Sequence, residues 1–326
     1  MGEFELIRRY FQRGAAAAAG HAAGAGDAVV LGIGDDCALL RAPANGQVLA
    51  ISSDMLIEGR HFFSGTDPAA VGHKSLAVNL SDLAAMGAEP LGFTLAIALP
   101  AIDEDWLEGF CEGLFKLAAR HACPLVGGDT TRGPLALSIT VFGQVPAAQA
   151  LRRDRARAGD ELWVSGPLGG ASFAVAARRR GDASPNAGAV RRLDWPQPRL
   201  ELGRRLRALA HAAIDLSDGL AGDLRHVLAA SSGTTGLSAE IVAADIPLDP
   251  CLAGLPPEDA LRHALHGGDD YELLFSAAPE DHERIEALSP GAGMIGRLRV
   301  GQGILLIGRD GESVPVERSG FDHFAQ

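Results

Sequence analysis

Apolar residues along this chain recur with two periods, and both periods occur in each half of the sequence. Continuous apolar runs bounded by Gly, Pro or Asp predict strands in the first half at 28–33, 47–53, 91–99, 123–128 and 135–145. Apolar positions three or four residues apart predict helices at 3–13, 67–88 and 103–121. The second of these helices begins at Asp67-Pro68, and we expect an interruption near Asn79. A Gly-rich loop is expected between the last two strands.

The second half follows a polar, Arg-rich segment at 146–161, which is typical of a connection between domains. Strand, turn and helix patterns then follow one another, with elements expected at 161–180, 200–210, 212–231, 264–277, 279–288 and 303–326. A Pro-containing loop is expected at 183–201. Because strands and helices mix in both halves, the sequence predicts an α/β (α+β) fold of two domains, 1–147 and 148–326.

The composition is that of a large acidic globular protein. The chain has 326 residues, 47% of them apolar, and a formal net charge of −12. This length is typical of two domains. The charge excludes the basic surface of a nucleic-acid-binding protein, and an anionic ligand would need metal ions to mediate its contact. Lys74 and Lys116 are the two lysines, and we expect Lys74 at the surface with its stem along apolar neighbours.

The cysteines indicate a reducing compartment, and the N-terminal residues do not form a signal peptide. The four cysteines form no Cys-x-x-Cys pair, and each is expected to be a small buried apolar residue. Residues 1–13 lack the long apolar core of a signal peptide, and no apolar run is long enough to cross a membrane. We therefore expect a cytoplasmic protein that binds neither membrane nor nucleic acid.

The tripeptide Leu-Ser-Asp occurs twice, at 80–82 and 216–218, each time where an apolar run meets small residues. Helix capping by Ser or Asp is the simplest explanation of either copy alone. Similar acidic positions follow strands or glycines along the whole chain, at Asp35, Asp36, Asp54, Asp82, Asp129, Asp215, Asp218, Asp269 and Asp270. Like charges brought together are costly unless a cation lies between them, and such oxygen ligands suit Mg²⁺. The pattern therefore predicts a site for several metal ions.

Other common nucleotide and metal motifs are missing from the sequence. Neither lysine follows the glycine pattern of a phosphate-binding loop, and the ten histidines include no His-Glu-x-x-His spacing. If this chain handles nucleotides, it does so through Mg²⁺ held by carboxylates.

Seven motifs together resemble the thiamine-monophosphate kinase family, in order from about Gly2 to the C-terminus: GIGDDCALL, SSDMLIEGRHF, KSLAVNLSDLAAMGA, LVGGDTTRGP, AIDLSDGLAGDL, GGDDYELLF and GFDHF. The family belongs to the aminoimidazole-ribonucleotide-synthetase-like superfamily. The resemblance implies two α/β domains with helices packed on mixed sheets, and a homodimer formed through the N-terminal domains. It also implies Mg²⁺-dependent phosphorylation of thiamine monophosphate by ATP.

The resemblance further implies roles for individual residues. The implied metal ligands are Asp36, Ser52, Ser53, Asp54, Asp82, Asp129, Asp215 and Asp218. The implied ATP contacts are Gly128, Asp129, Arg153 and Ser217. The implied contacts with thiamine monophosphate are His61, Asp269 and Phe321. The N-terminal domain would bind Mg²⁺ and ATP and form the dimer, and the C-terminal domain would complete the site. No side-chain nucleophile or base is expected, because a phosphate acceptor is already ionised.

The chain departs from the usual family pattern at three positions. Asp269 stands where Glu is more common, Phe321 where Tyr is common, and Ser53 where Thr is common. Asp269 is thus one methylene shorter, and Phe321 keeps an aromatic face without a hydroxyl group.

Several alternatives remain open at this point. Arg152 or Arg155 would serve as well as Arg153, and His61 also fits a plain surface residue on a loop after a strand. A related synthetase of the same superfamily is one alternative function, although selenophosphate synthetase relies on a reactive Cys or selenocysteine and a Lys near the N-terminus. In this chain the first Cys is Cys37 and the first Lys is Lys74, which argues against selenophosphate synthetase. The other alternative is a non-catalytic sensor that binds thiamine phosphates or nucleotides without turnover.

Overall fold

The computed structural model of the chain describes residues 3–12, 28–33, 37–44, 46–182, 185–234, 236–308 and 310–316. Contacts between residues divide the chain into two compact units. The first comprises Met1–Leu83 and Ala88–Ala148, and the second comprises Ala84–Gly87 and Gln149–Gln326. The roles that the sequence assigns to 1–147 and 148–326 stay predictions.

The first unit is built on a four-stranded sheet with the strand order β3-β6-β4-β5. β3 (Gln47–Ile57) and β4 (Glu89–Leu99) each pair antiparallel with β6 (Ala136–Pro146), and β5 (Leu125–Arg132) runs parallel to β4. The helices are α3 (Pro68–Ala85) and α4 (Glu104–Arg120). Shorter elements are α1 (Glu3–Leu6), the π-helical η1 (Ile7–Gln12), β1 (Val29–Leu31), β2 (Leu39–Leu40) and η3 (Ala147–Gln149).

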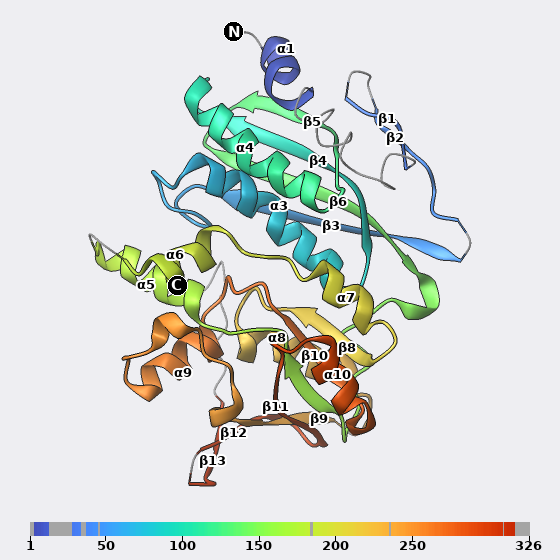
Figure 1. Ribbon diagram of the computed structural model, residues 1–326, viewed down its shortest axis with the longest axis vertical. Coiled ribbons are helices and arrows are strands. Elements are labelled where there is room, and N and C mark those ends of the chain that lie inside the picture. Colours follow the sequence, from blue (N-terminus) through green and yellow to red (C-terminus); the bar gives the residue numbers. More distant parts are fainter. Residues whose placement is uncertain are drawn as a thin grey trace. The chain divides into compact units, whose positions relative to one another are not determined.

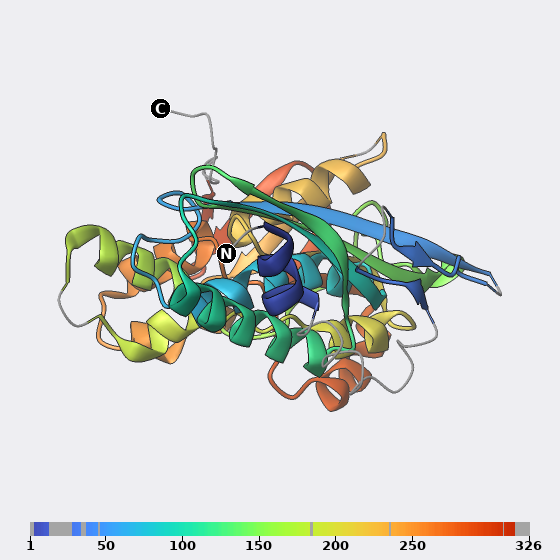
Figure 2. The same cartoon turned by 90° about the horizontal axis from the view of Figure 1, so that it is seen from above.

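Helices α3 and α4 lie on the same side of this sheet (Figures 1 and 2). α4 is amphipathic and begins at Asp103, whose side chain accepts a hydrogen bond from the backbone N–H of Trp106 at 3.1 Å. The two helices pack closely because Gly113 has no side chain: a Cβ there would lie 1.8 Å from the carbonyl oxygen of Ala69. One face of the sheet is thereby covered.

The opposite face of the first sheet carries exposed apolar side chains. Ile51 and Met55 on β3 are 58% and 56% exposed, and Ile57 is also exposed. Successive strand residues point to opposite faces, so these odd-numbered residues face away from α3 while Ser52, Asp54 and Leu56 face it. The two faces of β3 therefore have different surroundings.

Helix α3 is continuous, so the expected interruption near Asn79 is wrong. The Asn79 side chain donates to the carbonyl of Ser75 at 3.0 Å and accepts from the backbone N–H of Asp54 at 3.1 Å. This polar residue is therefore satisfied without a break in the helix. Lys74 on the same helix is only 4% exposed, so its expected surface position is also wrong.

The second unit contains a seven-stranded mixed sheet with the order β13-β12-β9-β11-β7-β10-β8. Its strands are β7 (Glu161–Val164), β8 (Ala210–Asp215), β9 (Leu237–Val242), β10 (Leu273–Ala277), β11 (Gly293–Val300), β12 (Gly303–Ile307) and β13 (Ser313–Pro315). Its helices are α5 (Gly170–Arg180), α6 (Ala187–Asp194), α7 (Leu200–Leu206), α8 (Leu220–Ser231), α9 (Pro257–His266) and α10 (His282–Leu288), with the 3₁₀ turns η4 (Ala243–Asp245), η5 (Pro250–Leu252) and η6 (Pro279–Asp281).

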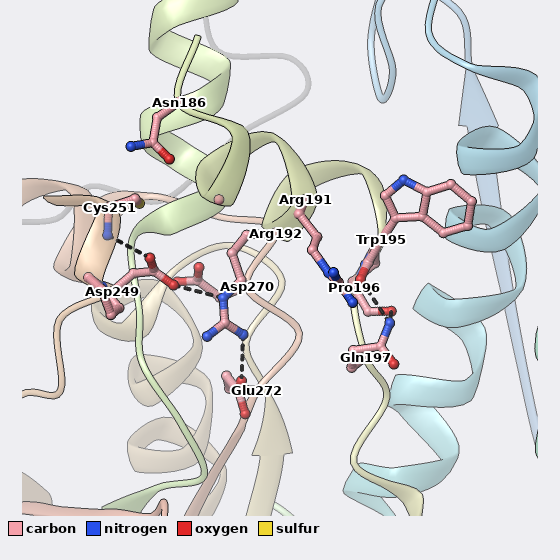
Figure 3. A pocket seen from close by; sticks show the side chains of 12 residues that line it. Asn186, Arg191, Arg192, Trp195, Pro196, Gln197, Asp249, Cys251, Asp270 and Glu272 are labelled. Atoms are coloured by element: carbon pink, nitrogen blue, oxygen red, sulfur yellow. Dashed lines mark hydrogen bonds and ion pairs between the residues drawn. The ribbon is translucent and has the colours of Figure 1, made fainter.

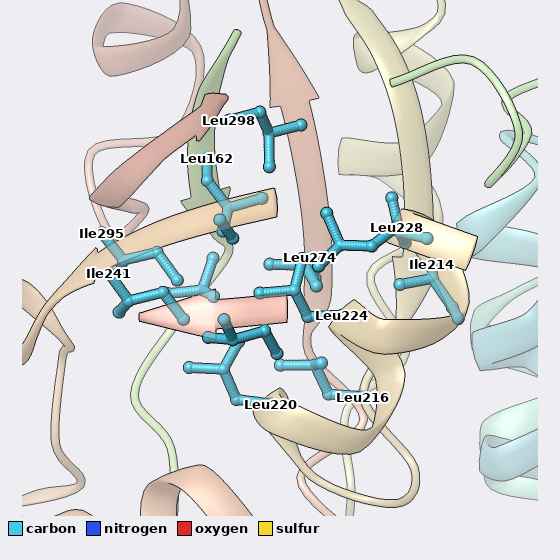
Figure 4. Close-up of a cluster of buried hydrophobic side chains, with 14 of the residues drawn as sticks. Leu162, Ile214, Leu216, Leu220, Leu224, Leu228, Ile241, Leu274, Ile295 and Leu298 are labelled. Carbon is cyan, nitrogen blue, oxygen red and sulfur yellow. The ribbon is translucent and has the colours of Figure 1, made fainter. Parts of the chain in front are cut away.

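The core of the second unit lies between its sheet and helix α8. Leu220, Leu224 and Leu228 of α8 pack toward side chains of the strands, among them Ile214 and Leu274 (Figure 4). Burial of this apolar stripe accounts for the position of α8. The turn that enters α8 is thus held against the ends of β8 and β10.

Three local predictions differ from the structure. The expected loop at 183–201 contains helix α6, which Asn186 caps by accepting from the backbone N–H of Ala189 at 3.1 Å. β5 continues to Arg132, so the expected Gly-rich loop is largely strand. Cys111 and Cys123 are buried as expected, whereas Cys37 is exposed and Cys251 is half-buried.

Candidate functional site

Three of the predicted metal ligands meet between β3 and α3. Ser52 Oγ donates a hydrogen bond to Oδ2 of Asp82. Asp54 lies two residues further along the same face of β3, and its carboxyl group is hydrogen-bonded to that of Asp82. Both acidic residues are half-buried. The first Leu-Ser-Asp copy therefore lies inside α3 and does not cap its start.

The two carboxyl groups are held together at an electrostatic cost. Burial, and then the negative charge and hydrogen bond of Asp82, raise the pKa of Asp54 to about 6. A divalent cation would remove this repulsion, and Mg²⁺ is commonly held by one or two carboxylates together with waters and substrate phosphates. The oxygen donors of Ser52, Asp54 and Asp82 fit such an ion. Within the part of the chain that the structure describes, no group of three or more His, Cys, Asp or Glu side chains is arranged so that it could hold a metal ion.

Ser53 and Asp129 do not join this cluster. Ser53 Oγ lies 3.0 Å from Oγ1 of Thr140 and donates to the carbonyl of Ile139 at 3.2 Å. Asp129 is exposed, and the strand register places it beside Ala96, in the row that continues through Ser138 to Met55. The register thus indicates the uncovered face of the sheet for both residues.

Gly128 precedes Asp129 at a point where β5 approaches β4 closely. Its φ is +152°, and a Cβ would lie 1.9 Å from the carbonyl oxygen of Leu95. Only glycine fits there without a shift of the backbone. This glycine therefore allows β5 to approach β4 closely at the residue before Asp129.

His61 lies in a tight turn after β3. Its Nδ1 accepts a hydrogen bond from the backbone N–H of Ile57 at 3.0 Å, so the proton of the neutral ring lies on Nε2. Lys74 Nζ donates to the carbonyl oxygen of His61 at 3.3 Å. The first contact fixes the orientation of the ring, and the second holds the backbone of the turn.

In the second unit, two predicted segments lie side by side. The backbone N–H of Asp269 donates to the carbonyl of Ser217 at 2.9 Å, and that of Tyr271 donates to Leu216 at 2.8 Å. Asp215 is buried at the end of β8, Asp218 is half-buried, and Ser217 is exposed. The structure therefore brings Asp215, Ser217, Asp218 and Asp269 into one region of this unit.

Sequence reasoning missed Asp223, which supports this region from the first turn of α8. Its Oδ2 accepts hydrogen bonds from the backbone N–H groups of Asp218 at 3.0 Å and Gly219 at 3.1 Å. Burial and the charge of Asp218 raise the pKa of Asp223 to about 7. The N-terminus of α8 has no side-chain cap from the second Leu-Ser-Asp copy. An acidic residue in the first turn of a helix is the sequence signal that identifies such a contact.

Segment 269–272 is anchored by alternate side chains. Both carboxylate oxygens of Asp270 accept from the backbone N–H of Gly169, at 3.1 and 2.9 Å. Glu272 is buried and accepts from Arg199 and Ser165. Burial raises the pKa of Asp270 well above its usual range.

The other two residues of this segment have a left-handed backbone. Asp269 has a φ of +70° and Tyr271 a φ of +50°, which is uncommon for residues other than glycine. The Tyr271 hydroxyl donates to Oδ1 of Asp269 at 3.1 Å. The anchored neighbours hold this backbone in place, a pattern found at functional sites.

A cavity of about 560 Å³, lined by both charged and apolar side chains, lies within the second unit beside the anchors. Figure 3 shows Asp249, Asp270 and Glu272 on one side of it and Trp195 on the other, with Arg191 and Arg192 between them. Arg192 Nε donates to Asp249 at 2.7 Å. The charges of this wall are therefore largely paired. Asp270 lines the cavity, whereas none of the residues to which the family resemblance assigns a role does so.

Three predicted site residues remain: Arg153, Asp36 and Phe321. Arg153 is exposed, and its carbonyl accepts from Ser231 Oγ at 2.8 Å. The Nε of its neighbour Arg152 donates a hydrogen bond to Oδ1 of Asp154 at 2.8 Å. Asp36 and Phe321 lie outside the described residues.

This chain is similar to known proteins over most of its length. The family model "AIR synthase related protein, N-terminal domain" matches residues 34–145. Thiamine-monophosphate kinase of Escherichia coli (strain K12) is 43% identical over 334 residues, with 99% of this chain and 98% of that protein covered.

Two solved structures are similar over most of the chain. The crystal structure of thiamine-monophosphate kinase from Stenotrophomonas maltophilia K279a has 46% identity and a TM-score of 0.81, covering 88% of this chain and 93% of that chain. The structure of AaThiL complexed with AMPPCP and TMP has 28% identity and a TM-score of 0.77, covering 87% of this chain and 90% of that chain. These matches confirm the predicted mixed α/β fold of the aminoimidazole-ribonucleotide-synthetase type. The chain belongs to the thiamine-monophosphate kinase family.

Proposed function

We propose that this chain transfers the γ-phosphoryl group of ATP to thiamine monophosphate, forming thiamine diphosphate and ADP. The observation that carries this proposal is the 43% identity to a thiamine-monophosphate kinase over 99% of the chain. AaThiL, a relative of the same fold, is complexed with AMPPCP, an ATP analogue, and with TMP.

The chemistry asks little of a general base. The acceptor is a phosphate oxygen that is already ionised at neutral pH, and the main barrier is repulsion between two anions. Bound Mg²⁺ would neutralise charge and align the phosphates for in-line transfer. The side chains of the chain then have to hold the ions and the two substrates in line. This requirement fits a site rich in Asp.

We assign the metal ligands to two groups, one in each unit. Ser52, Asp54 and Asp82 form the first group, and their mutual contacts support it. Asp215 and Asp218 form the second group. Asp36, Ser53 and Asp129 complete the proposed set, together with waters and substrate phosphates.

The proposed ATP contacts are Gly128, Asp129, Arg153 and Ser217. Exposure of Arg153 and Ser217 leaves these two residues accessible to a ligand. The proposed contacts with thiamine monophosphate are His61, Asp269 and Phe321. The thiazolium ring is cationic, so a carboxylate and an aromatic face both stabilise it. The Nε2–H of His61 is a suitable donor to a phosphate oxygen.

A homodimer is the proposed assembly, formed by a second copy on the uncovered face of the first sheet. The exposed Ile51, Met55 and Ile57 support this partner, because an apolar patch on a sheet is typical of an interface. We also propose a cytoplasmic location. Among the described residues, no helix is long and apolar enough to span a membrane.

The test is a coupled assay for ADP with ATP, Mg²⁺ and thiamine monophosphate, with thiamine diphosphate identified by mass. We expect ADP formation that requires both Mg²⁺ and the phosphate acceptor. Saturable binding of thiamine monophosphate without ADP would favour a sensor. Turnover with another acceptor alone would favour a related synthetase.

A further inference from the structure

Asp223 is a buried carboxylate that has no part in the proposed chemistry. It lies in the first turn of α8 and is only 3% exposed. Burial of a carboxylate is costly unless hydrogen bonds compensate it. Its position therefore needs an explanation beyond the packing of α8.

The contacts of Asp223 are directed to one turn of the backbone. Oδ2 accepts from the N–H groups of Asp218 and Gly219 at 3.0 and 3.1 Å. Gly219 has a φ of +106°, and a Cβ there would lie 2.8 Å from the carbonyl oxygen of Gly267. The turn thus has an unusual backbone that one side-chain oxygen holds at two consecutive amides.

The same turn is held from its other side by segment 269–272. In addition to the bonds from Asp269 and Tyr271, the backbone N–H of Leu216 donates to the carbonyl of Glu272 at 2.8 Å. Residues 216–219 therefore lie between the backbone hydrogen bonds to segment 269–272 on one side and the carboxylate of Asp223 on the other. The turn connects Asp215 with Asp218.

We propose that Asp223 is a positioning residue that fixes the turn between Asp215 and Asp218 so that both carboxylates reach the same metal-bound nucleotide. This inference rests on the proposed function, since it takes Asp215 and Asp218 as metal ligands. Asp223 acts through the two N–H groups and does not itself touch metal or substrate. An uncharged acceptor at the same place would serve equally, and this sets the test.

The experiment compares Asp223→Asn and Asp223→Ala in the full chain. Asn keeps an acceptor oxygen for both N–H groups, whereas Ala removes it. Asp194→Ala is the matched control, because Asp194 is also a buried carboxylate of the second unit and is paired with Arg178 instead. Hydrogen exchange of residues 216–219 is measured first, on the protein without metal or nucleotide. Mn²⁺ binding is then measured by electron paramagnetic resonance with AMPPCP present.

We expect Asp223→Ala to exchange faster at Asp218 and Gly219 and to bind Mn²⁺ about tenfold more weakly, as for the loss of a hydrogen bond to a charged group. Asp223→Asn should resemble the wild type in both measurements. Asp194→Ala should leave exchange at 216–219 and Mn²⁺ affinity unchanged. If Asp223→Ala does not fold, Asp223→Glu replaces it, since the longer side chain keeps the charge and displaces the acceptor.

Two results would overturn the inference. One is wild-type exchange and Mn²⁺ affinity in Asp223→Ala. The other is weak Mn²⁺ binding in Asp223→Asn with normal exchange, because the charge and not the position would then matter. A wild-type chain that binds Mn²⁺ with AMPPCP but forms no thiamine diphosphate would instead refute the proposed function.

Discussion

Ser52 and Asp82 are joined by a hydrogen bond from Ser52 Oγ to Oδ2 of Asp82, which ties strand β3 to helix α3. Asp54 meets Asp82 at the same place. Two carboxyl groups in contact are unfavourable without a cation, so this point combines a structural link with a site for metal.

Asp82→Asn should keep the fold and lose most of the kinase activity. The amide oxygen still accepts from Ser52, but a ligand charge is gone, and we expect turnover to fall by about a hundredfold or more. The measurement is ADP formation against Mg²⁺ concentration, with circular dichroism as the check on folding. Asp67→Asn at the start of the same helix is the control, because Asn can also accept from the backbone N–H of Ala69. Near-normal turnover of Asp82→Asn at saturating Mg²⁺ would exclude Asp82 as a ligand.

Gly128→Ala should destabilise the protein by about 3 kcal/mol, since its Cβ would overlap the carbonyl oxygen of Leu95. The free energy of unfolding in urea measures this effect. The matched control is Gly127→Ala, where the nearest atom to the new Cβ is Thr94 Cγ2 at 3.6 Å, an ordinary contact. Equal stability of the two variants would mean that the close approach of β5 to β4 is not a constraint.

Ile51→Lys combined with Met55→Lys should convert the proposed homodimer into a monomer. Two ammonium groups on the uncovered face would have to be desolvated in the interface. Light scattering after gel filtration gives the mass. Val300→Lys is the control, because Val300 is 67% exposed and belongs to the second unit, which contributes no residue to the proposed interface. An unchanged dimer mass in the double variant would place the interface elsewhere.

Phe321→Ala should raise the KM for thiamine monophosphate more than the KM for ATP. Loss of an aromatic face beside a cation corresponds to about tenfold in affinity. Initial rates with each substrate varied in turn give both constants, and Phe324→Ala serves as the control for the C-terminal segment. Equal changes in the two constants would contradict a contact with the thiazolium ring.

His121 should make the first unit less stable in acid. Burial, and then the charges of Arg120 and His73, lower the pKa of His121 from 6.5 to about 4. The unfolded chain therefore takes up a proton at a higher pH than the folded one, and stability is lost as the pH falls from about 6.5 toward 4. Urea unfolding at several pH values should show a smaller loss in His121→Gln. A parallel pH dependence of the two proteins would refute this contribution.

The fold class and family could be predicted from the sequence because long apolar runs and several motifs are spread over the whole chain. The position of Asp82 within its helix could not. Ser and Asp are good helix starters, but the start at Asp67-Pro68 lies far upstream and nothing between them breaks the helix. Lys74 was misplaced because α3 is buried over most of its circumference, which an amphipathic pattern does not anticipate.

The site could be predicted as a list of residues more readily than as a geometry. Ser52, Ser53 and Asp54 are consecutive, yet only Ser52 and Asp54 lie on the face of β3 that is directed toward Asp82 of helix α3. Whether the odd- or the even-numbered residues of β3 face helix α3 depends on the pairing of β3 with β6. This pairing joins residues that are distant in the sequence. The acidic Asp223 in the first turn of α8 indicates a contact with backbone N–H groups, but the sequence does not tell which N–H groups these are.

The alternation along β3 has a consequence for how this family can vary. One strand supplies Ser52 and Asp54 to its inner face and the exposed Ile51, Met55 and Ile57 to its outer face. A substitution changes one function at a time, whereas deletion of a single residue within β3 would turn both sets around together. The proposed metal binding and the proposed dimer formation therefore both depend on the register of β3. We expect the length of this strand to vary less within the family than most of its side chains.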